Sequence, residues 1–225
     1  MGASGEIAGG SQRLPEAMAA ALPREVRTNS PAMAISADET GASVTLASGE
    51  TLRSDFVVSA LPFPVVRNLE VDAPLLPQQR EAIDGMAYTP IVQVHMIASR
   101  PFWEEDGLPP SLWSDSDIER VFAGTNPDGT PNGALNAWIN GDGALALEEL
   151  SDEGVAAHVT GTLARLRPAS DGAVEVRHVV RWTPSNALAG GAYMHWQPGE
   201  ISRWAVDLAR PAGRLYIAGE HASHL

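Results

Sequence analysis

The segment Pro211–Leu225, with the sequence PAGRLYIAGEHASHL, decides the fold that we expect. It predicts a short strand over residues 215–218, after which the chain turns abruptly into Gly219, Glu220 and His221. In α/β folds, a strand that ends on a glycine and an acid often adjoins a nucleotide. Glycine lets the ligand approach the backbone, and the carboxylate accepts hydrogen bonds from ribose hydroxyls. The segment therefore predicts an α/β fold with a nucleotide site at this strand end.

Composition excludes several classes of function. The chain has 225 residues, of which 44% are hydrophobic, and this suits a globular protein with one large or two small domains. A formal net charge of -13 disfavours binding to DNA or RNA, whose phosphates attract cationic surfaces. All 15 basic residues are arginines and there are no cysteines, so Schiff-base lysines, disulfides, thiolate nucleophiles and cysteine-bound metals are excluded.

The chain shows no sequence signal for a membrane. No apolar run reaches the roughly 18 residues that a membrane span requires. Residues 1–10 lack the charged and apolar regions of an export signal. We therefore expect no membrane span and a cytoplasmic location.

The first 62 residues are predicted to form one helix followed by short strands. Apolar residues at helical spacing after Gly9-Gly10-Ser11 predict a helix over residues 12–22. Alternating apolar residues between turn-forming residues then predict a β-meander, with strands at residues 26–29, 32–37, 43–46 and 51–52. The run Phe56–Ala60 is apolar without alternation, which is typical of a buried strand in a parallel sheet.

The pattern changes after Pro64, which indicates a second module that is inserted into the first and ends near Arg181. Alternation over Ile91–Ala98 places Val92, Val94 and Met96 on one face of a long strand. The other elements predicted here are helices at 77–86 and 151–166, strands at 111–113, 120–123, 134–140 and 174–182, and a surface loop at 124–133. The helix at 151–166 begins with Ser-Asp-Glu as cap and first-turn acids and has Val155, Val159, Leu163 and Leu166 at helical spacing.

Five motifs occur in an order that resembles the flavin-dependent amine oxidase family, which includes monoamine, polyamine and L-amino-acid oxidases. The motifs are GGSQRL at 9–14, VRTNSPAMAI at 26–35 with GETLRSDFVVSALP at 49–62, PFW at 101–103, WTPSNALAGGAYMHWQPG at 182–199 and GRLYIAGEHAS at 213–223. Each motif is weak alone, but the five lie in register over nearly the whole chain.

The resemblance implies a fold, a cofactor and a reaction. It implies an α/β fold in which residues 1–62 and 184–225 are parts of an FAD-binding domain and residues 63–183 form a substrate domain with a mixed sheet. It also implies FAD as cofactor and oxidation of a small-molecule amine by hydride transfer to flavin, with dioxygen as acceptor. The alternative enzyme is a protoporphyrinogen oxidase or carotenoid desaturase type of FAD dehydrogenase, which the apolar strand Ile91–Ala98 leaves open.

Two family features are missing from this sequence. The G-x-G-x-x-G turn and the Gly-Gly-Arg segment, which together hold the FAD pyrophosphate, do not occur, nor does the Gly-Tyr-Met-Glu-Gly segment that covers the flavin ring. The chain is therefore expected to be the carboxyl-terminal portion of such a protein. A further alternative follows, in which the chain is a truncated and catalytically silent module that does not bind FAD alone.

The resemblance also assigns cofactor-binding residues. It places Glu220 beside the ribityl or phosphate-proximal part of FAD, with Gly219 allowing close approach; the alternative for Glu220 is an exposed acid of the loop without a binding role. The resemblance also explains His221 better than a metal site formed with His224 does. No metal is expected. By the same resemblance, the backbone of Ala32 binds the adenine and Trp182 packs beside the cofactor cavity, although an ordinary core role suits Trp182 equally well.

Three further residues are candidates for the reaction itself. Tyr193 matches an aromatic residue at the substrate face of the flavin, where a dry aromatic wall desolvates the amine; its alternative is a buried structural tyrosine. Gln93 stands where many members of the family carry a lysine that binds a water beside the flavin, and it can hold a water but carries no charge. His95, on the same strand face, is a second candidate donor, and its alternative is a packed histidine without a catalytic role.

Overall fold

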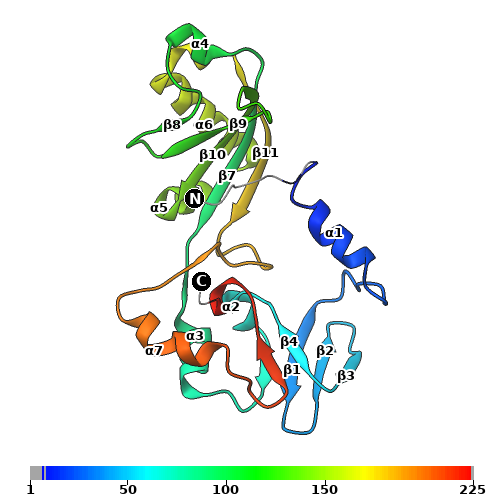
Figure 1. The fold of residues 1–225 in the computed structure, drawn as a ribbon. Coiled ribbons are helices and arrows are strands. Elements are labelled where there is room, and N and C mark those ends of the chain that lie inside the picture. Colours follow the sequence, from blue (N-terminus) through cyan, green and yellow to red (C-terminus); the bar gives the residue numbers. More distant parts are fainter. Residues whose placement is uncertain (1–6, 8, 224–225) are drawn as a thin grey trace.

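The protein folds into two lobes around separate hydrophobic cores. The structure is a computed structural model that describes residue 7 and residues 9–223. In Figure 1 the upper lobe holds a large sheet with three helices, and the lower lobe holds smaller sheets with three further helices. Helix α1 (Arg13–Ala20) stands apart at the side, close to the range predicted from the sequence.

The upper lobe is built on a five-stranded antiparallel sheet. Its strand order is β11-β7-β10-β9-β8, so β7 lies between β11 and β10. The strands are β7 (Ile91–Ala98), β8 (Leu112–Trp113), β9 (Arg120–Thr125), β10 (Pro131–Asn140) and β11 (Val174–Trp182). The helices are α4 (Phe102–Asp106), α5 (Gly141–Glu148) and α6 (Asp152–Leu166), and a 3-10 turn covers Pro168–Ser170.

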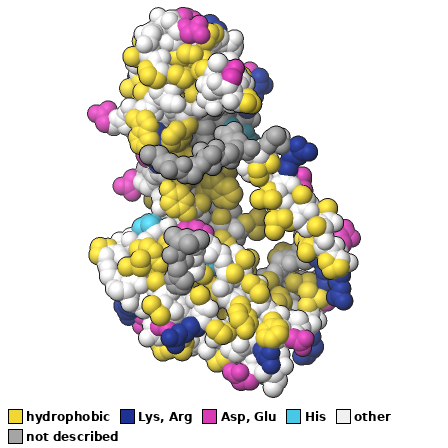
Figure 2. All heavy atoms as spheres, in the orientation of Figure 1, with side chains coloured by type: hydrophobic (Ala, Val, Ile, Leu, Met, Phe, Trp, Pro, Cys, Tyr) yellow, Lys and Arg dark blue, Asp and Glu magenta, His cyan; other side chains and the backbone are white. Residues whose placement is uncertain are grey.

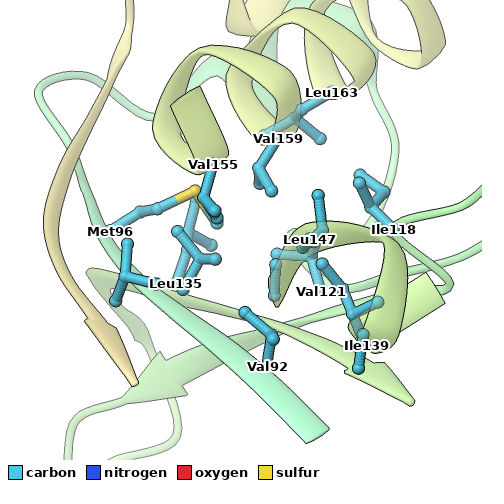
Figure 3. Packing of buried hydrophobic residues seen from close by; sticks show 14 of the residues in the cluster. Val92, Met96, Ile118, Val121, Leu135, Ile139, Leu147, Val155, Val159 and Leu163 are labelled. Atoms are coloured by element: carbon cyan, nitrogen blue, oxygen red, sulfur yellow. The ribbon is translucent and has the colours of Figure 1, made fainter. Parts of the chain in front are cut away.

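One face of this sheet forms the larger core. Val92, Val94 and Met96 are buried against α5 and α6, as the alternation of β7 predicted, whereas the intervening residues are only partly buried. Figure 3 shows Val155, Val159 and Leu163 of α6 pointing toward the sheet, where Val92 and Met96 of β7 lie. The helices therefore cover one face of the sheet and leave its opposite face open.

Helix α6 confirms its predicted start but not its whole apolar stripe. The Ser151 hydroxyl caps the helix by accepting a hydrogen bond from the Gly154 amide at 3.2 Å. Leu166, expected on the buried face, is 39% exposed because it lies in the last turn, beyond the reach of the core.

The lower lobe combines small sheets with helices that pack on one another. A four-stranded sheet has the order β3-β2-β1-β5, in which β5 is parallel to β1. Its strands are β1 (Ala32–Ala37), β2 (Ala42–Leu46), β3 (Thr51–Ser54) and β5 (Glu70–Asp72), and the helices are α2 (Phe63–Val66), α3 (Pro77–Gly85) and α7 (Glu200–Leu208). A core of residues such as Phe63, Ile83 and Trp204 joins the three helices.

Two short sheets complete the lower lobe. Strand β4 (Val57–Ser59) pairs in parallel with β13 (Leu215–Ile217), so segments near the two ends of the chain share one sheet. Strand β6 (Ala87–Tyr88) pairs with β12 (Met194–His195) in antiparallel orientation. Both pairings join residues more than a hundred positions apart.

Residues 56–60 were predicted to form a buried strand of a parallel sheet. The parallel pairing is confirmed, but the predicted burial is wrong. The strand is parallel to its neighbour, but Phe56 and Val58 are 48% and 64% exposed. The reason is that the β13-β4 sheet has only two strands, and the described part of the chain covers only one of its faces.

Two other expectations are wrong in detail. Residues 26–29 form no strand, because no described strand pairs with their backbone, although the Arg27 guanidinium donates two hydrogen bonds to the Glu50 carboxylate. The loop predicted at 124–133 is shorter than expected, since β9 continues to Thr125 and β10 begins at Pro131, and only residues 126–130 remain as the turn between them. Residues 63–85 pack with α7 in the lower lobe, and the domain boundaries at 62 and 183 stay a prediction.

Candidate functional site: the strand ends of the lower lobe

The parallel strands β4 and β13 end side by side, and the predicted nucleotide-binding loop follows β13. The Ala218 amide donates a 2.9 Å hydrogen bond to the Ser59 carbonyl, which holds the two strand ends together. A 3-10 turn over Glu220–Ala222 comes next and lies beside α2, on the side of the lower lobe that faces the upper sheet (Figure 1). The carboxyl ends of parallel strands are where α/β folds bind their ligands.

Gly219 needs to be a glycine in this loop. Its φ angle is +120°, and a Cβ atom there would lie 3.0 Å from Cε1 of His221. Side chains rarely adopt this backbone conformation. The residue is exposed, so its backbone is open to a ligand, as the sequence predicted.

Glu220 brings the loop next to strand β12. Its carboxylate is exposed, but partial burial raises the pKa of the Glu220 carboxyl, while a hydrogen bond from the Met194 amide lowers it. Burial also raises the pKa of the Tyr88 phenol, and the negative charge of Glu220 adds to that rise. Glu220, Met194 and Tyr88 therefore meet in one place, although the sequence separates them widely.

His221 points into the protein and has an unused polar atom. The residue is only 3% exposed, and its ring lies 4.2 Å from the ring of Phe63, centroid to centroid. The buried Nε2 atom has no hydrogen-bond partner in the described part of the chain. Burial lowers the pKa of the His221 imidazole, so the ring is neutral at pH 7.

The lowered pKa of His221 predicts acid sensitivity. The pKa of His221 in the folded protein is below the unfolded value of about 6.5. The neutral ring therefore contributes fully to the free energy of unfolding above about pH 6.5, and this contribution is lost as the pH falls from about 6.5 toward the folded pKa. We expect an NMR titration of the His221 ring to give a midpoint below 6.5. Urea unfolding at pH 7.5 and pH 5 should show a smaller loss of stability for His221→Gln than for the wild type. A His221 midpoint at or above the free value would contradict the prediction.

The second wall of the site is the turn that leads into β12. The Thr89 amide donates to the Tyr193 carbonyl at 3.0 Å, and the Ala192 amide donates to the Thr89 carbonyl at 2.9 Å. Tyr193 is 54% exposed, so it is not a buried structural tyrosine. Gly191 permits the close approach, because a Cβ atom there would lie 2.8 Å from Cβ of Tyr88.

His195, beside this turn, uses both ring nitrogens. Nδ1 lies 3.0 Å from the Thr89 hydroxyl, and Nε2 lies 2.8 Å from the Gln197 side-chain nitrogen. These contacts orient the ring and stabilise the turn that carries Tyr193. They leave His195 less available than Tyr193 for contact with a ligand.

Gln93, His95 and Trp182 belong to the open face of the upper sheet. The indole nitrogen of Trp182 donates to Oε1 of Gln93 at 3.1 Å, so the fold brings two of the predicted site residues together. His95 lies beside His178 on β11, and burial, with a smaller contribution from the His178 charge, lowers the pKa of the His95 imidazole. Figure 2 shows a hollow between the lobes, with hydrophobic side chains on its walls.

Ala32 occupies another part of the lower lobe. It begins β1, opposite Leu46 of β2, and no described contact joins it to the Gly219–His221 loop. Its predicted contact with adenine stays a prediction. His224, the other histidine considered for a metal, lies outside the described residues.

Sequence reasoning missed Tyr88 and Phe63 as parts of the site. The Phe63 amide donates a hydrogen bond to the Tyr88 hydroxyl at 3.2 Å, and the Phe63 ring packs against the imidazole ring of His221. Neither residue lies in a motif, and only the packing of α2 against β6 brings them to the loop. No group of three or more histidine, aspartate and glutamate side chains among the described residues is placed to hold a metal.

The residues at this strand end fit a nucleotide cofactor such as FAD. Glu220 is an exposed acceptor for hydroxyl groups, Gly219 leaves backbone accessible, and the unused Nε2 of His221 can pair with a ligand or a water. All three lie at the carboxyl end of a parallel pair of strands.

Comparison with known proteins identifies the family. The family model of flavin-containing amine oxidoreductases matches residues 1–225. The chain belongs to this family. Membership bears out the expected family and the α/β fold class, and the family is one of flavin-containing oxidoreductases, in agreement with the enzyme class and the FAD cofactor expected for the whole protein.

Individual relatives agree with this assignment. The flavin-dependent L-tryptophan oxidase RebO of Lentzea aerocolonigenes is 29% identical over 96% of this chain and 48% of its own length. The L-amino-acid oxidase BjussuLAAO-I of Bothrops jararacussu is 24% identical over 97% of this chain and 46% of its own length. A structure of putrescine oxidase bound to putrescine superposes with a TM-score of 0.78 at 26% identity, and covers 95% of this chain and 48% of that one. The amine oxidoreductase chain thus spans about half the length of the curated relatives it matches.

Proposed function

We propose that this amine oxidoreductase chain supplies the substrate domain and part of the FAD-binding domain of an oxidase. The reaction would be oxidation of a small amine by hydride transfer to flavin, with dioxygen as the final acceptor. The observation that carries the proposal is the meeting of the Gly219–His221 loop with Tyr88 and β12 at the ends of two parallel strands.

In this proposal, the lower lobe binds the cofactor. The Glu220 carboxylate would accept hydrogen bonds from the ribityl hydroxyls, and Gly219 would let the ligand lie against the backbone. Neutral His221 would present Nε2 to the ligand or to a bridging water. The flavin, when bound, supplies the electron acceptor that no amino acid side chain provides.

Side chains of both lobes would shape the place where the amine binds. The exposed ring of Tyr193 offers a π-face, and this ring would exclude water from the amine so that its neutral form is favoured. Oε1 of Gln93 accepts a hydrogen bond from the Trp182 indole N–H, and the Gln93 amide N–H groups, which have no partner among the described residues, could hold a water. The rigid β7–β11 pair would fix that amide in place.

A titration with FAD tests the proposal. The 225-residue chain is purified, mixed with FAD, and its absorbance is recorded between about 350 and 500 nm after removal of free flavin. Bound oxidised flavin that is bleached by an amine without oxygen, and recovers its colour in air, would support the proposal. A folded chain that retains no flavin and does not quench FAD fluorescence would contradict flavin binding by this part of the domain alone and favour the silent-module alternative.

Glu220 is the side chain whose loss should weaken flavin binding most selectively. We expect Glu220→Gln to weaken FAD binding by about 10-fold to 100-fold, because a hydrogen bond to a charged group is typically worth about 1.5–3 kcal/mol. Quenching of flavin fluorescence measures the dissociation constant. Glu149→Gln, an exposed acid of the upper lobe, is the matched control and should bind like the wild type. Equal affinity in the two variants would remove Glu220 from the site.

The place of action in the cell is a separate matter. No helix in the described part of the chain is both long and apolar enough to cross a bilayer. The cytoplasmic location stays a prediction.

A further inference from the structure

The open face of the upper sheet carries a wall of aromatic side chains. Trp113, Phe122 and Trp138, called the aromatic wall below, come from the neighbouring strands β8, β9 and β10. Their rings meet edge to face, at 6.0 Å between Trp113 and Phe122 and 6.3 Å between Phe122 and Trp138. Trp113 is 70% exposed, so the wall is accessible from solvent.

Arg120 lies within this wall, and the buried Nε of its guanidinium has no acceptor among the described residues. Its central carbon is 5.2 Å from the Trp113 ring and 5.9 Å from the Phe122 ring. Its Nε atom is buried and has no hydrogen-bond partner, and no ion pair joins Arg120 to any residue that the structure describes. A guanidinium is always charged and donates through all three nitrogens, so the buried Nε–H group is a donor that the described chain leaves unused.

Two comparisons show that the missing acceptor is unusual. Arg167, the buried arginine of the upper lobe, donates to both carboxylate oxygens of Asp106 and to the Pro109 carbonyl. The nearest acid in sequence to Arg120 is Glu119, but its carboxylate accepts two hydrogen bonds from Asn140, each at 2.7 Å. Although the protein is strongly acidic, Arg120 on the aromatic wall has no carboxylate partner among the described residues.

Asn136 adds an unused polar atom on the next strand. It lies directly opposite Phe122, and its Oδ1 atom is buried without a partner in the described chain. Buried polar groups are normally hydrogen-bonded, and each exception calls for an explanation. An unused cationic donor and an unused neutral acceptor thus stand beside one set of aromatic rings.

We propose that Arg120, Asn136 and the aromatic wall form a binding site for a small aromatic carboxylate. The guanidinium would bind the carboxylate with paired hydrogen bonds, and the rings would pack against the aromatic part of the ligand. Oδ1 of Asn136 is an acceptor, so it would accept a hydrogen bond from an N–H group of the ligand, such as that of an indole, and not contact the carboxylate. This occupant is chosen by charge complementarity, because a neutral arene or an amine without a carboxylate leaves Arg120 unpaired. Inorganic phosphate shares the anionic chemistry but has no ring to contact the wall.

The site would define the substrate class of the proposed oxidase, and this step rests on the proposed function. In the register of the sheet, Arg120 of β9 lies opposite Trp138 of β10, and Trp138 lies opposite Gln93 of β7. Arg120 and Gln93 are thus two strands apart, about 10 Å between backbones. A substrate whose carboxylate binds Arg120 can therefore extend along the same sheet face toward Gln93. Amines that carry both an aromatic ring and a carboxylate would be preferred over simple amines.

Calorimetric titration of the chain without flavin tests the binding site directly. The ligands are indole-3-propionate, tryptamine, propionate and inorganic phosphate, which separate the ring from the anion. We expect indole-3-propionate to bind at least about 10-fold more tightly than each of the other three. Arg120→Met should weaken its binding by about 10-fold to 100-fold, and Asn136→Ala by a smaller factor.

Control variants keep the result interpretable. Arg53→Met, an exposed arginine on β3 of the other lobe, should bind indole-3-propionate like the wild type. Arg120→Lys retains the charge without the planar guanidinium and should recover part of the affinity that Arg120→Met loses. Circular dichroism confirms that each variant is folded.

Three outcomes would overturn the proposal. They are equal affinity for indole-3-propionate in Arg120→Met and wild type, equal affinity of the wild type for tryptamine, and no binding at millimolar ligand. Because flavin is absent, a failure here is distinct from a failure of the proposed function, which the FAD titration decides alone.

Discussion

Gly190→Ala is expected to destabilise the protein by about 2–5 kcal/mol, the sum of backbone strain and a steric clash. The φ angle of Gly190 is +69°, and a Cβ atom there would lie 2.3 Å from Cβ of Pro64, next to the first residue of α2. The clash would separate the turn that carries Tyr193 from the helix that supports His221. The cofactor site should therefore be damaged together with the fold.

Gly107→Ala is the control for the strain alone. Gly107 has the same φ angle of +69°, but nothing lies within 4 Å of the position of its Cβ atom. We expect a cost of about 1–2 kcal/mol for this variant. Urea unfolding of both variants against wild type measures the difference. If Gly190→Ala costs no more than Gly107→Ala, the packing of the turn on Pro64 is not as tight as described.

Leu163→Ala should cost about 2–5 kcal/mol, because it leaves a cavity in the larger core. Leu163 is 2% exposed and lies between α6 and the sheet, among Val159, Ile118 and Val121 (Figure 3). The close packing of these neighbours limits how far they can collapse into the space.

Leu166→Ala provides a matched comparison in the same helix. The change of residue is identical and the helix propensity of alanine is equally favourable at both places, so only burial differs. Leu166 is 39% exposed, and we expect its replacement to cost about 1 kcal/mol or less, well below the cost at Leu163. Thermal and urea unfolding of the two variants give the comparison, and similar costs would show that α6 does not pack as described.

Local patterns predicted much of the secondary structure correctly. The ranges of β1, β7 and β11 agree with the strands expected from alternation, and α6 begins at the predicted cap. Alternation and capping act over a few neighbouring residues, so they can be read directly from the order of amino acids. Helices α5 and α7 were not predicted, although Trp204 and Leu208, four residues apart, are the signal that could have found α7.

The sequence by itself determined the periodicity of the elements, the absence of lysine and cysteine chemistry, and the strand that ends at Gly219 and Glu220. Contacts in the folded chain set the rest: Glu220 meets Met194 and Tyr88, Val58 is exposed, and the buried Nε of Arg120 has no acceptor among the described residues. These properties depend on which distant segments pack together, because burial and hydrogen-bond partners are set by contacts between elements that no local pattern encodes.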